Sequence, residues 1–325
     1  MSFYPPLSAA LVTLLLIRLL MYNQAAKKLQ DIPNERSLHR TPVPRIGGVG
    51  LVAGVLCGWA LLFSSLTWWL VLPLLFLFGV SLLDDMLSLP VKQRMLAHLL
   101  AAAILVGGSG LFAQQGVVIA VALLLLTVWM TNLYNFMDGS DGLAGGMALC
   151  GFGMYGFAAW ISHNTTVATL NFCIAAASAS FLYSNFHPAK IFMGDSGSIP
   201  LGFLVAAMGL LGWQQGCWAS WFPLLVFSPF IVDASVTLVK RSLRGVKVTE
   251  AHREHYYQRL VMLGWGHRNV ALAEYALMLA TGISALWVLN NPFPWQMFLA
   301  WGVIYISVML PLDAQWKNFK RGNNV

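Results

Sequence analysis

The sequence predicts an all-α, polytopic integral membrane protein, and its composition is the first reason. Hydrophobic residues make up 58% of the 325 positions, charged residues only 10%, and the mean hydropathy is +0.70. Soluble domains carry about 25% charged residues. The 19 basic and 12 acidic side chains are therefore too few to form the polar surface of a soluble protein of 35.7 kDa.

Eleven apolar stretches are expected to cross the bilayer as helices, since one crossing takes about 20 residues. They cover residues 7–22, 47–63, 68–83, 96–112, 116–133, 143–161, 167–184, 199–212, 219–239, 269–289 and 296–312. Their Leu, Val, Ala and Phe runs do not alternate with polar residues, which favours helices over the strands of a membrane barrel. Together they predict a single transmembrane domain over residues 1–325.

The charged residues lie almost entirely in every second connection. The connections at 1–6, 64–67, 107–115, 162–166, 213–218 and 290–295 contain no Lys, Arg, Asp or Glu. Those at 23–46, 84–95, 134–142, 185–198, 240–268 and 313–325 contain all but three of the charges. The positive-inside rule places this second set in the cytoplasm, with the N-terminus outside and the C-terminus inside. Because carboxylates contribute little to topology yet share that side, the pattern favours an enzyme at the cytoplasmic face over a transporter.

Four groups of acidic residues stand at the inner ends of the predicted spans. They are Asp84-Asp85, the segment 132–142 with Asn135, Asp138 and Asp141, the segment 185–198 with Asn185 and Asp195, and Asp233 in the ninth stretch. Mg²⁺ prefers oxygen ligands and typically takes one or two carboxylates, with water and substrate phosphates completing its shell. Since Asp195 leads into a span, the first amides of that helix are also expected to suit a phosphate.

Each acidic group also has a structural explanation. An Asp at a helix start is often an N-cap, which applies to Asp141. Asp84 and Asp85 fit a solvated helix end, Asp195 fits a turn, and Asp233 fits a buried pair with a basic side chain. Four such groups on one face favour a site over four separate caps. Adjacent aspartates point about 100° apart on a helix, so Asp84 and Asp85 are expected to have different roles.

The longest inner connection, 240–268, is basic and carries two histidines, His252 and His255. Zinc is one explanation, but a third ligand at the usual spacing is missing and no Cys is near. A solvated loop attracted to anionic lipid is another. With the carboxylates on the same face, the favoured hypothesis is a loop that holds a diphosphate.

Five motifs, in order along the chain, resemble those of the polyprenyl-phosphate N-acetylhexosamine-1-phosphate transferase family. They are Arg40-Thr-Pro42-x-Pro44-Arg-x-Gly47-Gly48, Asp84-Asp85, Asn135-x-x-Asp138-Gly-x-Asp141-Gly-Leu, Pro188-Ala-Lys-Ile-Phe-Met-Gly194-Asp195-x-Gly-Ser and His252-x-x-His255. The resemblance runs from about Ser37 to His267, which is most of the chain.

The resemblance implies an activity and the residues that carry it. A UDP-N-acetylamino sugar would give its sugar 1-phosphate to undecaprenyl phosphate at the cytoplasmic face of the bacterial inner membrane, with release of UMP and a requirement for Mg²⁺ or Mn²⁺. Catalytic roles are implied for Asp84, Asp85, Asp138 and Asp141, and metal ligation for Asp195 with Asp85. Substrate contacts are implied for Asn135, Lys92, Lys190, Asn185, His252, Arg253 and His255.

The last loop departs from one branch of this family. The peptidoglycan branch carries consecutive histidines, whereas this loop reads His252-Arg253-Glu254-His255, which favours the branch that initiates O-antigen or common-antigen synthesis. The expected partners are the two substrates and membrane lipids, without nucleic acid; a homodimer is left open. A transporter or lipid flippase remains an alternative because of His98 and the Gly-rich spans. A CDP-alcohol transferase is a weaker one, since its DGxxAR core is absent.

Overall fold

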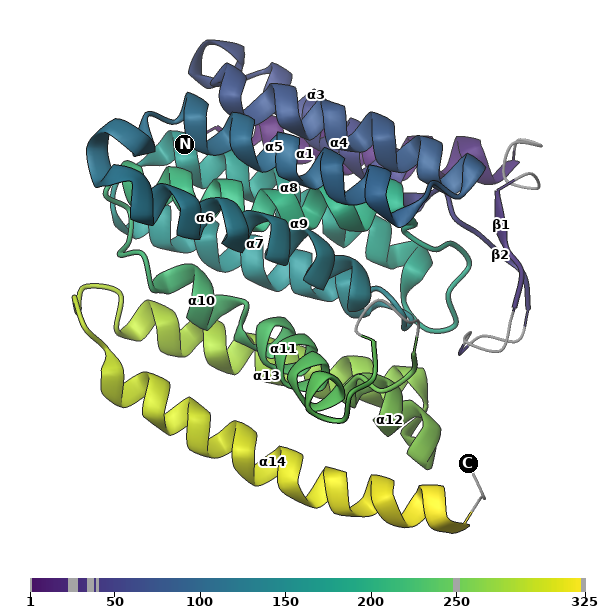
Figure 1. Ribbon diagram of the computed structural model, residues 1–325. Helices are drawn as coiled ribbons and strands as arrows, with labels where there is room; N and C mark the ends of the chain where they lie inside the picture. Colours follow the sequence, from purple (N-terminus) through teal and green to yellow (C-terminus); the bar gives the residue numbers. More distant parts are fainter. Residues whose placement is uncertain (1, 23–28, 34–37, 39–40, 248–251, 323–325) are drawn as a thin grey trace.

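The computed structural model describes residues 2–22, 29–33, 38, 41–247 and 252–322 (Figure 1). Its helices are α1 (Tyr4–Tyr22), α3 (Gly47–Ala60), α4 (Trp68–Leu87), α5 (Val91–Gly108), α6 (Leu111–Phe136), α7 (Leu143–Ile161), α8 (Thr165–Asn185), α9 (Asp195–Gln214), α10 (Phe222–Val226), α11 (Ser228–Leu243), α12 (Tyr256–Leu260), α13 (Gly266–Trp287) and α14 (Trp295–Gly322). A 3₁₀ turn covers Phe63–Ser65 and a π turn covers Val261–Trp265. Strands β1 (Gln30–Asp31) and β2 (Val43–Pro44) pair antiparallel.

The prediction of an all-α, multi-pass membrane protein is confirmed. Within the described ranges, eight helical segments are long and apolar enough to cross a membrane: α1, α4, α6, α7, α8, α9, the segment Tyr256–Trp287 and α14. The other predicted stretches correspond to α3, α5 and the pair α10–α11, which are shorter or less apolar. The two termini lie at opposite ends of the bundle (Figure 1). The count of eleven crossings and their orientation stay predictions.

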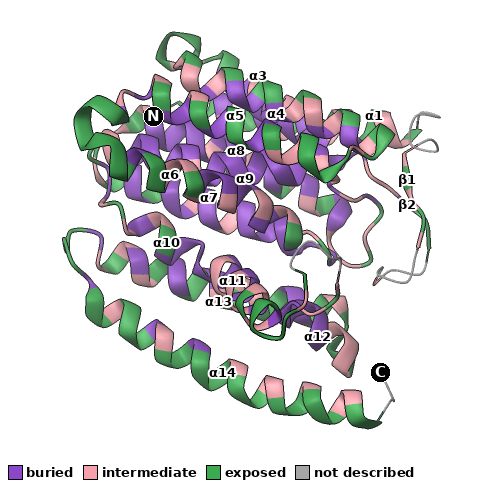
Figure 2. Cartoon of the chain, in the orientation of Figure 1, coloured by how far each residue is buried: buried purple, intermediate pink, exposed green. Residues whose placement is uncertain are grey.

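Helix α9 forms the centre of the larger group of helices and packs against α3, α4 and α6. Small residues allow the backbones to approach closely, as is usual between membrane helices. A Cβ atom on Gly202 would lie 2.7 Å from the carbonyl oxygen of Met130 in α6, and one on Gly48 would lie 2.3 Å from the amide nitrogen of Gly197. Burial is greatest in α7, α8 and α9, whereas α14 is mostly exposed (Figure 2). The face of α14 is therefore available to lipid.

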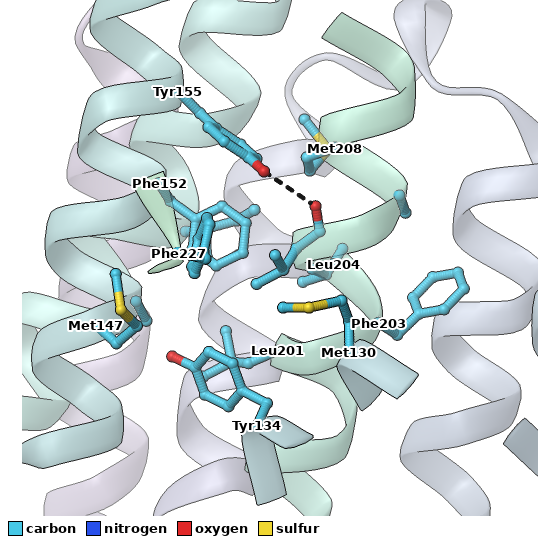
Figure 3. Packing of buried hydrophobic residues seen from close by; sticks show 14 of the residues in the cluster. Met130, Tyr134, Met147, Phe152, Tyr155, Leu201, Phe203, Leu204, Met208 and Phe227 are labelled. Carbon is cyan, nitrogen blue, oxygen red and sulfur yellow. Dashed lines mark hydrogen bonds between the residues drawn. The ribbon is translucent and has the colours of Figure 1, made fainter. Parts of the chain in front are cut away.

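The ninth predicted stretch is broken into two helices, α10 and α11. Pro229 lies in the first turn of α11 and has no N–H to continue a helix from the preceding turn. Phe227 stands at the break and packs edge-to-face on Phe152 and Tyr155 of α7, with ring centroids 5.7 and 5.3 Å away. Tyr155 also donates a hydrogen bond to the carbonyl of Val205 in α9 (Figure 3). This aromatic cluster fixes the direction in which α11 leaves the bundle.

Candidate active site

The connections that carry the predicted motifs meet at one end of the bundle, around a cavity of about 270 Å³. We call it the polar cavity. Its lining includes Asn135, Asp138, Asp141, Asn185, Asp195 and Gln258, together with Arg45, Phe192 and His267. Residues separated by more than 100 positions in the chain thus share one wall. Five of these are predicted site residues, which come from the ends of α6 and α8, the loop after α6 and the start of α9: Asn135, Asp138, Asp141, Asn185 and Asp195.

Asp138 follows the end of α6 and faces this cavity. Burial raises the pKa of its carboxyl group well above the ordinary value, and the negative charges of Asp195 and Asp85 raise the pKa further. Arg45 opposes the shift. A carboxyl group held in this way among other acids favours a nearby cation, because a positive charge would relieve both the burial and the repulsion.

Asp195 is the first residue of α9 and lines the same cavity. Its Oδ1 atom accepts a hydrogen bond from the Nδ2 atom of Asn135 at 3.1 Å. The guanidinium of Arg94 lies 3.5 Å from its Oδ2 atom and 3.3 Å from Oδ2 of Asp84. Arg94 therefore bridges the two aspartates and links the start of α5 to the start of α9.

Asp85 caps α9 from a different helix. Its two carboxylate oxygens accept the backbone N–H groups of Asp195 and Ser196, each at 2.9 Å. Gly194 precedes the cap with φ +72°, and a Cβ atom there would lie 2.9 Å from an Asp85 oxygen, so only glycine fits this position without strain. Asp85 is not part of the lining of the polar cavity. Asp85 is thus placed to hold Asp195.

The first amides of α9 are therefore not free for a phosphate, contrary to the sequence prediction. Those of Asp195 and Ser196 bond to Asp85, and those of Gly197 and Ser198 bond to the carbonyl of Gly194. The sequence could not show this, because the capping carboxylate is supplied from 110 positions earlier in the chain.

Asp84 points to another side of α4, as the helical geometry predicts. Its Oδ1 atom accepts the N–H of Leu89 at 2.6 Å, and Oδ2 faces Arg94. The side chain is buried and fixes the turn between α4 and α5. Asp84 thus places Arg94, and Arg94 in turn contacts Asp195.

Asp141 and Asn185 join two loops of the polar cavity. The Asp141 carboxylate contacts the imidazole Nδ1 atom of His187 at 2.7 Å and accepts the N–H of Ala189 at 3.1 Å. Asn185 accepts the N–H of Gly142 and donates to the carbonyl of Ile191. Their polar atoms are largely engaged within the protein, so both side chains serve as walls that fix the shape of the cavity.

A second cavity, of about 680 Å³, opens beside the first between α5, α6, α11 and α12. We call it the amphipathic cavity. One part of its lining is apolar, with Met95, Leu125, Val128, Trp129, Ile199 and Leu238; the other part carries Arg94, Asn132, His98, His252 and His255. Three residues line both cavities: Asn135, Asp195 and Gln258. A polar chamber and a partly apolar chamber therefore adjoin at Asp195.

The two histidines of the last loop line the amphipathic cavity and not the polar one. Their rings lie 4.9 Å apart, between centroids. The pKa of His252 falls to about 4 because of its burial and the charge of His255 beside it, with Arg241 adding to the effect. The neighbouring Glu254 faces away and pairs with Arg241 at 2.9 Å and with Arg244. His252 is thus neutral near pH 7.

The three predicted basic contacts lie elsewhere. Lys92, Lys190 and Arg253 are exposed and are not part of the lining of either cavity. Arg94 and Arg45 supply the positive charge instead; Arg45 lines the polar cavity and pairs with Asp31. Arg45 stands in the first quoted motif, whereas Arg94 stands outside the motifs. The helical phase of α5 turns Arg94 inward while Lys92 faces out. Arg40 lies outside the described residues.

Sequence reasoning also missed Gln258 and His267. Gln258 is fixed by the first turn of α12, where its Oε1 atom accepts the N–H of His255 at 3.2 Å. His267 reaches the polar cavity from the start of α13, and its Nδ1 atom lies 2.8 Å from the hydroxyl of Ser140. Neither residue stands in a motif of its own, so the local sequence held no signal for them.

Among the described residues, Asp233 makes no ion pair with Lys or Arg, and its contacts are those of a helix cap. Its carboxylate accepts the backbone N–H groups of Tyr256 and Tyr257 at 2.9 and 3.0 Å, which caps α12 as Asp85 caps α9. Across the described part of the chain, no three His, Cys, Asp or Glu side chains form a metal-binding group. Mg²⁺ typically takes only one or two carboxylates from a protein, and Asp138 and Asp195 both line the polar cavity.

This geometry defines a class of protein: a helical membrane protein in which a carboxylate-lined cavity lies beside a partly apolar one. Residues 67–212, which include α4 to α9 and three of the acidic groups, match the model of Glycosyl transferase family 4. This part of the chain is thus similar to that family.

Relatives match over a larger part of the chain. It is 29% identical over 319 residues to the probable undecaprenyl-phosphate N-acetylglucosaminyl 1-phosphate transferase of Bacillus subtilis, which covers 92% of this chain and 87% of the relative. It is 29% identical over 292 residues to the decaprenyl-phosphate N-acetylglucosaminephosphotransferase of Mycobacterium tuberculosis, covering 75% of this chain and 71% of the relative. A phospho-N-acetylmuramoyl-pentapeptide-transferase of Levilactobacillus brevis is also 29% identical, over 283 residues, covering 77% and 85%.

Proposed function

We propose that this protein transfers an N-acetylhexosamine 1-phosphate from a UDP-sugar to undecaprenyl phosphate and releases UMP. The observation that carries the proposal is the junction of the two cavities at Asn135, Asp195 and Gln258. A reaction between a water-soluble nucleotide and a membrane lipid needs one chamber of each character, with the reacting phosphates at the border. The names of the relatives favour the same chemistry.

The polar cavity is the proposed site of the UDP-sugar. Its volume of about 270 Å³ and its lining of amides, carboxylates and Arg45 suit a ligand with many hydrogen-bonding groups. Phe192 adds an aromatic surface to this wall. The diphosphate would lie toward Asp195, since that end of the cavity meets the second chamber.

The amphipathic cavity is the proposed site of the lipid phosphate. Its apolar lining from α6, α9 and α11 suits the prenyl chain, while Arg94 and the two histidines stand where the phosphate would lie. Arg94 is the best placed cation, because it contacts Asp195 at the border of the cavities. A cation at this position offsets the charge of a phosphate monoester, which is about −1.5 to −2 near pH 7.

We propose Asp195 and Asp138 as the residues that hold the divalent cation, Mg²⁺ or Mn²⁺. The charge of Asp195 raises the pKa of the Asp138 carboxyl group, and a bound cation would take the place of the proton that this favours. When bound, the ion would offset the charges of the two phosphate groups. Asp85 is proposed as the residue that positions Asp195, since both of its oxygens accept backbone amides.

The proposed reaction is a direct displacement. A phosphate oxygen of the lipid attacks the β-phosphorus of the UDP-sugar, the bond to the bridging oxygen breaks, and UMP leaves with the bonding electron pair. A general base is not required, because the attacking phosphate is mostly ionised already. Asn135 orients Asp195, Arg94 offsets charge, and the protein contributes mainly position and electrostatics. An aspartyl-phosphate intermediate is the alternative route, and trapping one without lipid would establish it.

We also propose at which membrane face the reaction takes place and which glycan it starts. The concentration of basic residues in one set of connections favours the cytoplasmic face of the bacterial inner membrane. The relatives named for N-acetylglucosamine favour UDP-N-acetylglucosamine, and the last loop favours the start of an O-antigen-type glycan over peptidoglycan.

The test is UMP release by the purified protein in detergent, with UDP-N-acetylglucosamine, UDP-N-acetylgalactosamine and UDP-N-acetylmuramoyl-pentapeptide supplied in turn. We expect release with the first sugar only when undecaprenyl phosphate and Mg²⁺ are both present. Release without lipid, or no release with any of the three, would contradict the proposal. A lipid flippase would instead move labelled undecaprenyl phosphate across vesicles without forming UMP.

A further inference from the structure

The carboxylate of Asp233 in α11 is almost fully buried, with 6% of the side chain exposed. Besides the two amides of α12, its Oδ1 atom accepts the hydroxyl of Thr237 at 3.2 Å and lies 3.3 Å from the Nδ1 atom of His255. A carboxylate that receives two backbone N–H groups acts as an acceptor only. The Nδ1 atom of His255 therefore lies on the side of the ring that faces Asp233, and Nε2 lies on the opposite side.

The ring of His255 is held in one orientation. Phe136 stacks on it with centroids 6.2 Å apart and planes 25° apart, and Tyr257 stacks at 5.9 Å and 15°. Tyr257 is itself tied to the carbonyl of Phe136 by a hydrogen bond of 3.0 Å. Only 4% of the His255 side chain is exposed, yet the residue lines the amphipathic cavity. The ring is thus held between two aromatic side chains at the wall of that cavity.

We propose that Asp233 is a positioning residue of the reaction, acting through His255: it holds Nδ1–H so that Nε2 meets the phosphate of the lipid acceptor. This inference rests on the proposed function and assigns a part of it. The arrangement works in both protonation states of the ring. A neutral Nε2 accepts a hydrogen bond from a monoanionic phosphate, and a protonated one donates to a phosphate oxygen, while Nδ1–H stays on Asp233 in either case.

The geometry makes the effect specific to one substrate. His255 lines the amphipathic cavity and not the polar one, so the loss of its orientation should change kcat and the KM for undecaprenyl phosphate. The KM for the UDP-sugar should stay within about twofold of the wild-type value. A general collapse of α12 would change both, because Gln258 of the same helix lines both cavities.

Asp313 of α14 provides a matched control. It holds the same short helix from the other side, through the hydroxyl of Tyr256 at 3.0 Å, the guanidinium of Arg259 at 2.8 Å and the ammonium of Lys240. It makes no contact with His255. Asp313→Asn therefore loosens α12 without removing the hydrogen-bond partner of the imidazole.

The experiment is a double-mutant cycle on kcat/KM for undecaprenyl phosphate, with Asp233→Asn, His255→Gln and both together. We expect a loss of about 10- to 100-fold for each single variant, the usual effect of removing the group behind a functional histidine. Apart from a loss like that of Asp313→Asn, which also loosens α12, the double variant should be about as active as His255→Gln alone, because Asp233 then has no imidazole left to orient. The effects of Asp313→Asn and His255→Gln should multiply.

Multiplying losses for Asp233→Asn and His255→Gln, or an equal change in the KM for the UDP-sugar, would overturn the inference. An inactive wild-type protein would instead refute the proposed function. If Asp233→Asn is not recovered folded, Thr237→Val replaces it, since this nearly isosteric change removes only the hydroxyl bonded to the same Oδ1 atom. Its expected loss of about 2- to 10-fold should disappear in the His255→Gln background. Full activity of Thr237→Val, or a loss that persists there, counts against the inference.

Discussion

Asp85→Asn separates two roles for the second aspartate of the pair. If Asp85 is a base or a metal ligand, the change removes activity and leaves the fold intact. If it caps α9, as the two 2.9 Å bonds to the amides of Asp195 and Ser196 indicate, the change disturbs the fold and the site together.

The size of the stability change follows from those two bonds. Asparagine keeps one acceptor oxygen and turns its NH₂ group toward the other amide, so one hydrogen bond to a charged group is lost, at about 1.5–3 kcal/mol. The change also removes one negative charge near Asp138, which offsets part of the loss. We expect a net destabilisation of about 2 kcal/mol. A displacement of Asp195 by about 1 Å is expected to lower kcat about 100-fold.

Thermal unfolding in detergent measures the first quantity, with a thiol-reactive dye that reports exposure of the buried Cys173 and Cys217. UMP release measures the second, as a function of Mg²⁺ concentration. A cap predicts a lower unfolding temperature and a nearly unchanged half-saturating Mg²⁺ concentration. Unchanged stability, with a loss beyond about 10⁴-fold or a large shift in Mg²⁺ dependence, would refute the cap and favour a catalytic or metal role.

Three further predictions use the same assays. Asp195→Asn should lower turnover at least about 1,000-fold while the folded yield stays near that of the wild type, and retained activity would remove Asp195 from the site. Arg94→Gln should cost about 10- to 100-fold and Lys92→Gln less than about threefold, because only Arg94 lies at the border of the cavities; equal losses would contradict the placement. Burial lowers the pKa of His252 to about 4 in the folded protein. As the pH falls, the unfolded chain therefore takes up a proton at this residue at a higher pH than the folded protein does. Stability should therefore decrease from about pH 6.5 toward pH 4, and His252→Gln should remove that part of the dependence; an unchanged profile in the variant would exclude this cause.

The sequence was sufficient for the fold class because membrane helices follow from local composition. Each predicted stretch lies where the structure has a helix, since about 20 apolar residues without charge have few other stable forms in a bilayer. The break between α10 and α11 was missed because the apolar run continues through Pro229, and composition alone does not register a missing N–H.

The site was predicted less completely, because side-chain direction depends on contacts distant in sequence. Asn135, Asp138 and Asp195 share the polar cavity as their motifs suggest. Lys92 and Arg94 are equally basic and only two positions apart, yet the turn between α4 and α5 exposes one and directs the other to Asp195. That turn depends on Asp84, whose contacts no local pattern reveals.

The acidic residues around the polar cavity include some that face the cavity and others that cap a helix. Asp85 and Asp233 each accept two successive amides at the start of a helix that carries site residues, α9 in one case and α12 in the other. An aspartate that caps the helix of another segment cannot be told from a metal ligand by its local sequence. The two roles differ only in the contacts that the folded protein gives the carboxylate. This division explains how a site with few charges is kept rigid: Asp85 and Asp233 satisfy the first amides of α9 and α12, whereas Asp138 and Asp195 line the cavity.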